Sequence, residues 1–324
     1  MPICKMTLSH VDKCLFLWNT LIKQNELLYK PLVKDQFILK FLKSTDQLKI
    51  ISFVDEDNQK INGFVSGVIV EDKQKAYLTT IIVDPSQRRH KIGSSLLKAF
   101  EDEIINHYDF VKTIDVIFFN PIQLEWIIPN TNNHDHPNAP GVDIDALGYD
   151  FLNAMGYIQF AKQNSYYKNI ENYTYNQDIL STIDDLKKHG ITITFFDSSK
   201  HHGLNELFED LKNPYWTEEI TKATESHLPV LIAEKKGFVI GFTGPLGVQK
   251  SLRGYFAGIG VHSGYRGYGV GKVLFSSLCL DLSKLGADYM TLFTGDANSA
   301  RRIYEKEGFK IVRSWANMRK EIKK

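Results

Sequence analysis

The chain has 324 residues, of which 43% are hydrophobic, 12% aromatic and 24% charged, which excludes the disordered, collagen-like and disulfide-scaffold classes. Lys and Arg number 39 and Asp and Glu 38, giving a net charge of +1. Nucleic-acid or membrane-surface partners are therefore not expected, because affinity for phosphates grows with the number of charges neutralised. At roughly 150 residues per domain, the length predicts two domains.

The hydrophobic pattern of the first half predicts strands in a row, followed by alternating helices and strands. In chain order, we expect a strand at 3–8, helices at 11–25 and 34–42, strands at 49–54, 61–70 and 77–83, a helix at 92–105 and a strand at 111–119. Such an order is typical of a mixed sheet flanked by helices.

The second half repeats this order. We expect a strand at 191–196, helices through 222, strands at 229–234, 237–243 and 254–261, a helix at 269–285, a strand at 288–294, a helix at 298–307 and a last strand from 309. Between the halves, residues 172–190 are polar and then amphipathic. They predict a short connecting helix that ends at Gly190, although the helix can equally belong to the first half.

A fixed spacing relates the two halves. Gly63-Phe64 recurs as Gly241-Phe242, at an offset of 241 − 63 = 178. Three further pairs keep the same offset: Val83 and Val261, Arg88 and Arg266, and Gly93 and Gly271. We therefore predict two copies of one module, the first at 1–171 and the second at 191–324, joined by the connector at 172–190.

Three cysteines, Cys4, Cys14 and Cys279, are far apart and form no C-x-x-C pair. Neither a disulfide framework nor a cysteine-based zinc site is expected, and a reducing compartment fits best. The first residues do not resemble a secretory signal, and apolar runs such as 64–70 are far shorter than the roughly 20 residues of a membrane span. We expect a cytoplasmic protein.

The most informative stretch is 258–272, in which a predicted strand enters a glycine-rich turn that opens a helix. Such a turn presents backbone N–H groups and a positive helix end to an anion. A P-loop is excluded because positions 266 and 273 are Arg and Val, and the Rossmann pattern fails because Lys272 occupies its last glycine position. What remains is R-x-x-G-x-G, formed by Arg266, Gly269 and Gly271.

This motif resembles the acyl-CoA pyrophosphate loop of the GNAT family of N-acetyltransferases. A second segment agrees with the family, because Asn298, Ala300, Tyr304 and Gly308-Phe309 follow in the expected order. The resemblance covers 191–324 well and the first half more loosely. It implies an α/β (α+β) fold of two tandem modules, each a mixed, mostly antiparallel sheet flanked by helices.

The resemblance also implies roles for residues of the second copy. The strand from Ile259 to Val261 would pair with the pantetheine arm, and the Val261 N–H would polarise the thioester carbonyl. Tyr304 would donate a proton to the departing thiolate. The expected cofactor-binding residues are Ile259, Val261, Arg266, Gly267, Tyr268, Gly269, Val270, Gly271, Lys272 and Asn298.

The reaction implied is transfer of an acetyl group from acetyl-CoA, or another acyl group from its CoA thioester, to a primary amine of a small molecule by direct attack. The general base could be Glu234, His262 or Asp296. Two of the named residues also fit structural roles: His262 as a loop residue and Lys272 as a solvated residue at a helix start. A non-enzymatic CoA sensor and a transferase acting on a peptide or protein amine are alternatives. A monomer or homodimer without a metal is expected.

The first copy departs from the motif. Lys91 replaces the first glycine, in a helical conformation that we expect to cost little, and Leu152 and Ala146 stand where the second copy has Tyr304 and Asn298. We therefore expect the first copy to be degenerate.

The first copy also carries about 26 extra residues, at 120–145. A loop of this length is usually functional or disordered. Trp126 and several prolines predict an ordered lid over a substrate pocket that the modules share. Two histidines and two carboxylates in this insertion are weak evidence for a metal site: His134, Asp135, His136 and Asp143.

Overall fold

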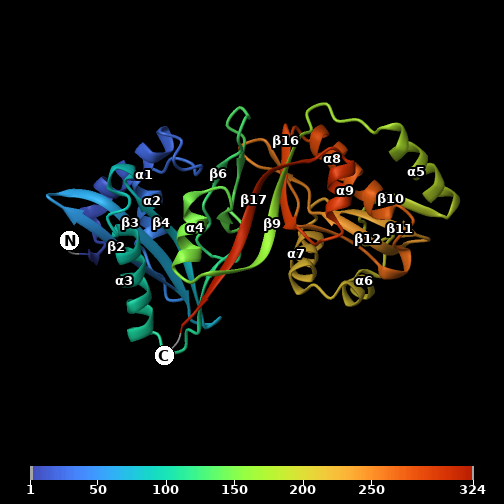
Figure 1. Ribbon diagram of the computed structural model, residues 1–324. Helices are drawn as coiled ribbons and strands as arrows, with labels where there is room; N and C mark the ends of the chain where they lie inside the picture. The colour runs from blue at the N-terminus through green and yellow to red at the C-terminus, as the bar shows by residue number, and fades with distance from the viewer. Residues whose placement is uncertain (1–2, 323–324) are drawn as a thin grey trace. The chain divides into compact units, whose positions relative to one another are not determined.

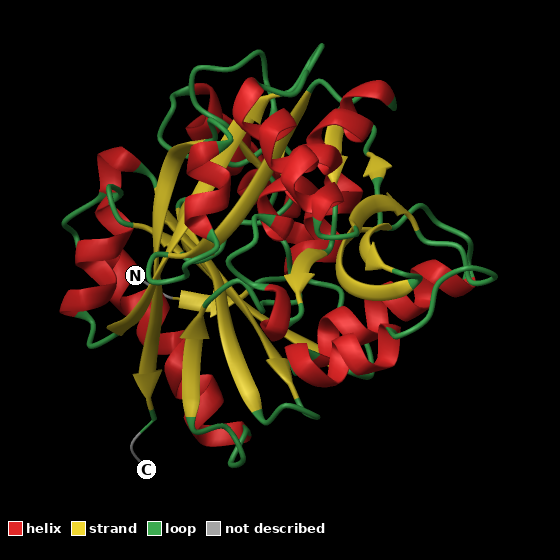
Figure 2. Cartoon of the chain, turned by 90° about the vertical axis from the view of Figure 1, so that its right-hand side faces the viewer, coloured by secondary structure: helices red, strands yellow, loops and turns green. Residues whose placement is uncertain are grey.

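A computed structural model describes residues 3–322. The chain divides into two compact units. The first runs to Ser165 and also contains the segment from Arg313 onward, and the second runs from Tyr166 to Val312. Each unit contains a mixed sheet with helices, as the sequence predicts (Figures 1 and 2).

The sheet of the first unit is antiparallel along four strands: β1 (Ile3–Lys5), β2 (Leu48–Asp57), β3 (Lys60–Val70) and β4 (Lys75–Val83). Strand β5 (Thr113–Val116) then joins β4 in parallel. The N-terminal strand is shorter than predicted, as is β5, which ends before the expected residue 119.

Helices cover both faces of this sheet because successive residues of a strand point to opposite sides. Phe64 packs in a cluster with residues of α1 (Val11–Lys23) and α2 (Lys34–Phe41). Its neighbour Val65 packs with residues of α3 (Ile92–His107). The alternating apolar pattern of β3 thus builds two cores, one on each side of the sheet.

The second unit has the same layout. An antiparallel sheet contains, in spatial order, β10 (Ile191–Phe195), β11 (Leu231–Lys235), β12 (Phe238–Gly244) and β15 (Gly258–Val261). Two further pairings, each of two positions, join β13 (Gly247–Val248) to β14 (Arg253–Tyr255) and β14 to β16 (Tyr289–Gly295). Its helices include α6 (Leu204–Leu211), α7 (Pro214–Glu225), α8 (Val270–Lys284) and α9 (Arg301–Lys306).

The single strand predicted at 254–261 is in fact two strands. A Cβ added to Gly254 would contact Leu282 and Met290, whereas one added to Gly258 would contact Trp216 on the other side of the sheet. Residues four apart in a regular strand point the same way, so the chain carries an irregularity around Ala257. As a result β14 pairs with β16, whereas β15 pairs with β12.

The last strands of the two copies are exchanged. β17 (Lys310–Glu321), at the end of the second copy, pairs with β5 of the first unit, with Met318 opposite Val116. Its Lys320 ammonium forms an ion pair with Glu101 at 2.7 Å and lies 5.6 Å from the Tyr157 ring centre.

The first copy contributes the reciprocal strand. β9 (Ile158–Asn169) runs into the second unit, where it pairs with β16. Lys168 on β9 lies over the Phe309 ring, as Lys320 on β17 lies over the Tyr157 ring. The boundary predicted at 191–324 therefore differs from the structure, in which the last residues of the second copy complete the first unit.

The connecting segment also lies elsewhere than expected. Helix α5 (Gln177–Lys188) is part of the second unit, where it packs on α8 and β10. Gly190 follows the helix with a φ of +70°, a left-handed conformation that suits glycine beyond a helix end. The helix and its stop were predicted, but its membership of the second unit was not.

The insertion at 120–145 is ordered. It contains β6 (Trp126–Ile127), β7 (Asp135–His136) and β8 (Val142–Asp143), and α4 (Leu147–Ala154) follows. Trp126 is fully buried, donates its indole N–H to Asn138 O at 3.0 Å and packs edge-on against Trp315. Trp126 is thus a buried anchor that holds the insertion against β17 rather than the surface of a pocket.

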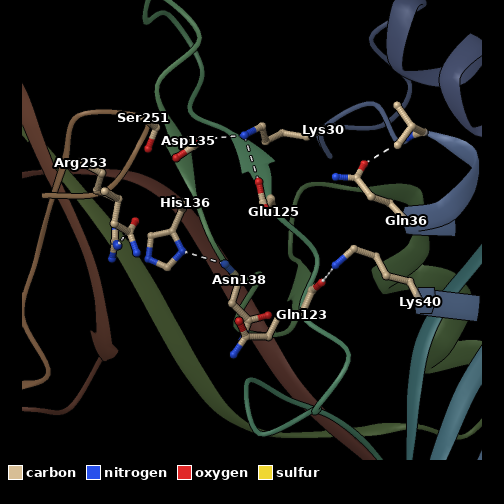
Figure 3. Close-up of polar contacts among 12 residues, drawn as sticks. Lys30, Gln36, Lys40, Gln123, Glu125, Asp135, His136, Asn138, Ser251 and Arg253 are labelled. Atoms are coloured by element: carbon tan, nitrogen blue, oxygen red, sulfur yellow. Dashed lines mark hydrogen bonds and ion pairs between the residues drawn. The ribbon is translucent and has the colours of Figure 1, made fainter. Parts of the chain in front are cut away.

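The carboxylates of the insertion form ion pairs. Lys30 lies 2.7 Å from Asp135 and 2.9 Å from Glu125 (Figure 3). Arg313 lies 2.7 Å from Asp143. Between residues 3 and 322, no group of three or more His, Cys, Asp or Glu side chains is placed to hold a metal ion. Over the same residues no helix is long and apolar enough to cross a membrane.

Candidate active site

The outer edge of β15 offers backbone groups to a ligand. Strand β15 is the last strand of its sheet, and Gly260 lies opposite Phe242 of β12. The His262 N–H donates to Ile240 O at 2.9 Å. Because hydrogen-bonding direction alternates along an antiparallel strand, the N–H groups of Ile259 and Val261 point away from β12, toward the outer edge.

The turn after β15 is held in place by side chains. His262 Nδ1 accepts a hydrogen bond from the Gly264 N–H at 3.1 Å, so this ring caps the turn. The Asp210 carboxylate accepts from the Ser263 N–H at 2.7 Å and from the Ser263 hydroxyl, and these bonds hold the pKa of Asp210 below its usual value. Arg266 Nε donates to Val261 O at 3.3 Å.

Two glycines shape the loop that opens α8. Gly267 and Gly269 have φ values of +88° and +86°, in the left-handed region that L-residues avoid. A Cβ added to Gly267 would meet open space, whereas one added to Gly269 would lie 2.6 Å from Thr182. The first N–H groups of α8 have no partner within the helix, which makes this glycine-lined turn fit a pyrophosphate.

The side chain of Lys272 points toward α5. Its ammonium contacts the carboxylate of Asp178 and donates to the Thr182 hydroxyl at 3.1 Å. This ion pair lowers the pKa of Asp178. At Lys272 the backbone N–H is therefore the group available to an anion.

Helix α9 begins beside this loop. A Cβ added to Gly271 would lie 3.2 Å from Ile303 and 3.5 Å from Val261, so the loop, β15 and α9 converge. Asn298 caps the turn before α9: Oδ1 accepts from the Ala300 N–H at 3.0 Å and Nδ2 donates to Thr294 at 2.9 Å. Asp296 forms an ion pair with Arg301 at 3.3 Å.

Tyr304 projects from α9 into the core of the second unit. Its ring centre lies 4.9 Å from that of Phe275 and 6.0 Å from that of Tyr166, and 7% of the residue is exposed. Burial, and then the neighbouring Tyr166, raise the pKa of Tyr304 to about 12. The phenol is thus protonated at neutral pH and able to donate a proton.

Glu234 belongs to a hairpin. One carboxylate oxygen accepts from the Thr192 hydroxyl and the other from the Gly237 N–H at 2.7 Å. The first bond joins β10 to β11 and the second holds the β11–β12 turn, so the structure gives Glu234 a structural role. Of the three carboxylate or imidazole candidates for the base, each has a local structural partner.

A polar cluster near the strand break was missed by sequence reasoning. The phenols of Tyr215 on α7 and Tyr255 on β14 lie close enough to influence each other's pKa. Burial raises the pKa of both, and the nearby Glu219 carboxylate adds to the rise. Trp216 packs directly on Gly258, where a Cβ would lie 2.2 Å from its indole nitrogen. The signal in the sequence was the glycine at 258, which leaves room for this ring.

A second missed feature is a buried carboxylate one turn after Tyr304. Glu307 is 5% exposed and accepts hydrogen bonds from the hydroxyls of Tyr173 and Ser276. Burial and the bond to Glu307 raise the pKa of Tyr173. These bonds tie the end of α9 to α8 through Ser276 and to the segment before α5 through Tyr173.

The first copy follows the same backbone path without glycine. Arg89 and Lys91, at the positions of Gly267 and Gly269, have φ values of +69° and +63°. The expectation that Lys91 is helical is wrong: it is the left-handed residue before α3. Each such residue costs roughly 1–2 kcal/mol relative to a right-handed conformation.

Comparison with known proteins identifies the class. A family model described as acetyltransferase (GNAT) family matches residues 18–122, and one described as acetyltransferase (GNAT) domain matches residues 226–311. The chain therefore belongs to the GNAT family and contains two GNAT domains in tandem. A search of the curated proteins finds no match.

Solved structures share the fold over the whole chain. A tandem GNAT protein from the clavulanic acid biosynthesis pathway is 14% identical, with a TM-score of 0.58, and the match covers 99% of this chain and 98% of that one. A GCN5-related N-acetyltransferase from Sphaerobacter thermophilus is 14% identical, with a TM-score of 0.62 and coverage of 100% and 96%.

A third similar structure contains a glucosamine N-acetyltransferase region of a fungal multi-domain GH3 β-N-acetylglucosaminidase. It is 18% identical, with a TM-score of 0.68, and the match covers 98% of this chain. This chain spans only 38% of that protein's length. At these identities the similarity shows the fold alone.

Proposed function

We propose that the second module transfers an acetyl group from acetyl-CoA to a primary amine of a small molecule. The observation that carries the proposal is the convergence, within one unit, of the outer edge of β15, the glycine-lined start of α8 and the Tyr304 helix. An edge strand offers amide partners to the pantetheine arm, and the helix start offers N–H groups to the pyrophosphate.

Two groups of this chain would act on the reacting atoms, and a third would position the helix that carries one of them. The Val261 N–H, directed away from β12, would stabilise the thioester oxygen as negative charge develops on it. Tyr304 would protonate the departing thiolate, because its phenol carries its proton at neutral pH. The Asn298 amide, already committed to the turn before α9, would hold the helix start in position.

The amine acceptor would bind beside the phenols of Tyr215 and Tyr255. Both residues lie near the strand break, and Glu219 places a carboxylate close to their hydroxyls. A carboxylate with two phenols suits an ammonium group, which needs charge neutralisation to bind and a proton acceptor to become nucleophilic. We assign these residues to amine binding within the same proposal.

The test is release of free thiol from acetyl-CoA across a panel of small amines, including amino sugars, polyamines and amino acids. We expect one amine class to raise thiol release well above the hydrolysis rate. A stoichiometric acetylated amine, detected by mass spectrometry, establishes the transfer.

Two variants make the assignment specific. Gly271→Asp places a carboxylate beside the anion site and should abolish amine-dependent thiol release, whereas the matched Gly93→Asp should leave it intact. The proposal fails if Gly93→Asp removes the activity and Gly271→Asp does not, or if only peptide amines are accepted.

A further inference from the structure

The cleft of the first copy begins at the same place as that of the second. Strands β4 and β5 pair at only two positions, Ala76 with Ile114 and Tyr77 with Asp115. From Leu78 onward the edge of β4 is without β5. By the 178-residue offset, Leu78 and Thr79 correspond to Phe256 and Ala257, where β14 ends and the second copy diverges.

In the first copy a side chain of the insertion fills this position. The Asn120 carboxamide donates to Leu78 O at 3.4 Å and to the Thr79 hydroxyl at 3.0 Å. Its Oδ1 accepts from the Ile122 N–H at 2.9 Å, and 8% of the residue is exposed. Asn120 thus gives the β4 edge the amide N–H that a pantetheine arm would otherwise supply.

Little space remains beside Asn120. A cavity of about 30 Å³ lies between the strand residues Leu78 and Val116 and the insertion residues Asn120 and Ile122. That volume holds roughly one or two waters. A thioester with its pantetheine arm needs far more room, so it cannot enter without moving the insertion.

The insertion is held at several points along its length. Lys40 donates to Gln123 O at 2.6 Å (Figure 3). Asn138 donates to Phe118 O at 3.0 Å. Asn317 donates to Pro140 O at 2.5 Å. Gly141 lies so close to β17 that a Cβ would be 2.3 Å from Ala316 O, an approach that requires glycine.

The second copy has no such segment between the matching elements. In the first copy β5 ends at Val116 and α4 begins at Leu147, whereas in the second β16 ends at Gly295 and α9 begins at Arg301. The short link of the second copy leaves no length for an internal occupant. The first copy thus has an insertion long enough to fill the space between its strands, and the second copy has none.

We propose that the insertion at 120–141 is a built-in occupant of the first copy's cleft. Asn120 takes the place of an acyl-thioester arm, so that the chain accepts acyl-CoA at one module instead of two. This inference rests on the proposed function only for the identity of the ligand.

A ligand-free measurement tests the occupant itself. Hydrogen exchange of the full chain should show protected amides across 120–128, and Asn120→Ala should accelerate exchange there roughly ten-fold, the rate change for a loss of about 1.4 kcal/mol. Exchange at 258–272 is the internal control and should not change. Exchange at 120–128 as fast as in an exposed loop would overturn the inference.

Calorimetric titration with acetyl-CoA tests the consequence. We expect one site per chain, lost in Gly271→Asp and retained in the matched Gly93→Asp. Two sites, or residual binding in Gly271→Asp that disappears when Gly93→Asp is added, would overturn the inference. If no acetyl-CoA binds at all, the proposed function fails, and the exchange experiment still decides whether Asn120 fills the cleft.

Discussion

The two loops that follow β4 and β15 have the same backbone conformation at matching positions, but different residues occupy those positions. In the second unit the left-handed positions are Gly267 and Gly269, and in the first they are Arg89 and Lys91. The first copy retains the path although each L-residue there costs roughly 1–2 kcal/mol. The loop path is therefore a property of the fold, and it does not by itself show which copy is functional.

The copies differ more sharply at the helix that follows. Tyr304 on α9 has a phenol with a raised pKa, whereas its counterpart on α4, Leu152, is a buried aliphatic residue. Asn298 caps the turn before α9, but Ala146 at the start of α4 makes no side-chain cap. The chemistry of the family motif survives in one copy only.

The largest expected effect is at the proposed acid. Tyr304→Phe removes the proton donor and retains the ring that packs on Phe275, so kcat should fall by roughly 10²–10³ with the fold intact. Tyr166→Phe is the matched control, because its hydroxyl donates to Glu305 and its loss should change kcat less than about three-fold. Equal losses in the two variants would reassign the acid.

The expected pH dependence of the Tyr304 contribution to kcat follows from the raised pKa of its phenol. The pKa of Tyr304 is raised to about 12, so the donor is fully protonated below that pH and is lost only as the pH rises toward it. The ratio of wild-type to Tyr304→Phe kcat should therefore stay constant between about pH 6 and pH 9. A ratio that falls within this range would show that Tyr304 titrates there and is less buried than the structure has it.

The next largest effect is expected for a change at Glu307, the buried carboxylate near the end of α9. Glu307→Gln weakens the bonds to Tyr173 and Ser276, and should lower the free energy of unfolding by roughly 1–3 kcal/mol. The first copy has Met155 at this position, so Met155→Leu is the matched conservative change and should have little effect. Denaturant unfolding followed by tryptophan fluorescence measures both. A neutral Glu307→Gln variant would refute the role.

Exchanging loop residues between the copies has a smaller effect. Gly269→Lys gives the second copy the residue of the first, and should cost roughly 1–2 kcal/mol because of its left-handed φ. Contact of its Cβ with Thr182 should weaken acetyl-CoA binding as well. Thermal unfolding and calorimetric titration give the two quantities, and an unchanged affinity would mean that the ligand does not approach this turn.

The smallest expected effect is a gain in stability rather than a loss. Lys91→Gly relieves the left-handed strain in the first copy but makes the unfolded chain more flexible, so the net gain in stability should be about 0.5–1 kcal/mol. Lys98→Gly, within α3, is the control and should destabilise by about 1 kcal/mol. A destabilised Lys91→Gly variant would show that the lysine side chain itself stabilises the loop.

Much of this molecule was predictable because its signals are local. Alternating and helical apolar patterns place β2 to β4 and α8 within a few residues, and the 178-residue offset shows two copies. Arg266, Gly269, Gly271 and Tyr304 are indicated by the resemblance of their segments to the GNAT motif. Each of these features depends on residues close in the chain, where turn chemistry and periodicity act.

The backbone conformation of Lys91 and the side-chain neighbour of Tyr255 were not predictable from such local signals. Lysine is common in helices, so nothing local shows that Lys91 has a positive φ until α3 is seen to begin after it. Tyr255 meets Tyr215 because the strand breaks around Ala257 and α7 lies over that face. Side-chain neighbours of this kind depend on packing between distant segments.

By itself, then, the sequence determined two GNAT-like copies, their elements and the unequal motifs. Only the tertiary structure decided that β9 and β17 are exchanged, because both strands have twelve residues, and local patterning does not distinguish one sheet edge from another. It also decided where the insertion goes: Asn120 finds Leu78 and Thr79 through long-range hydrogen bonds, which no periodicity in the chain records.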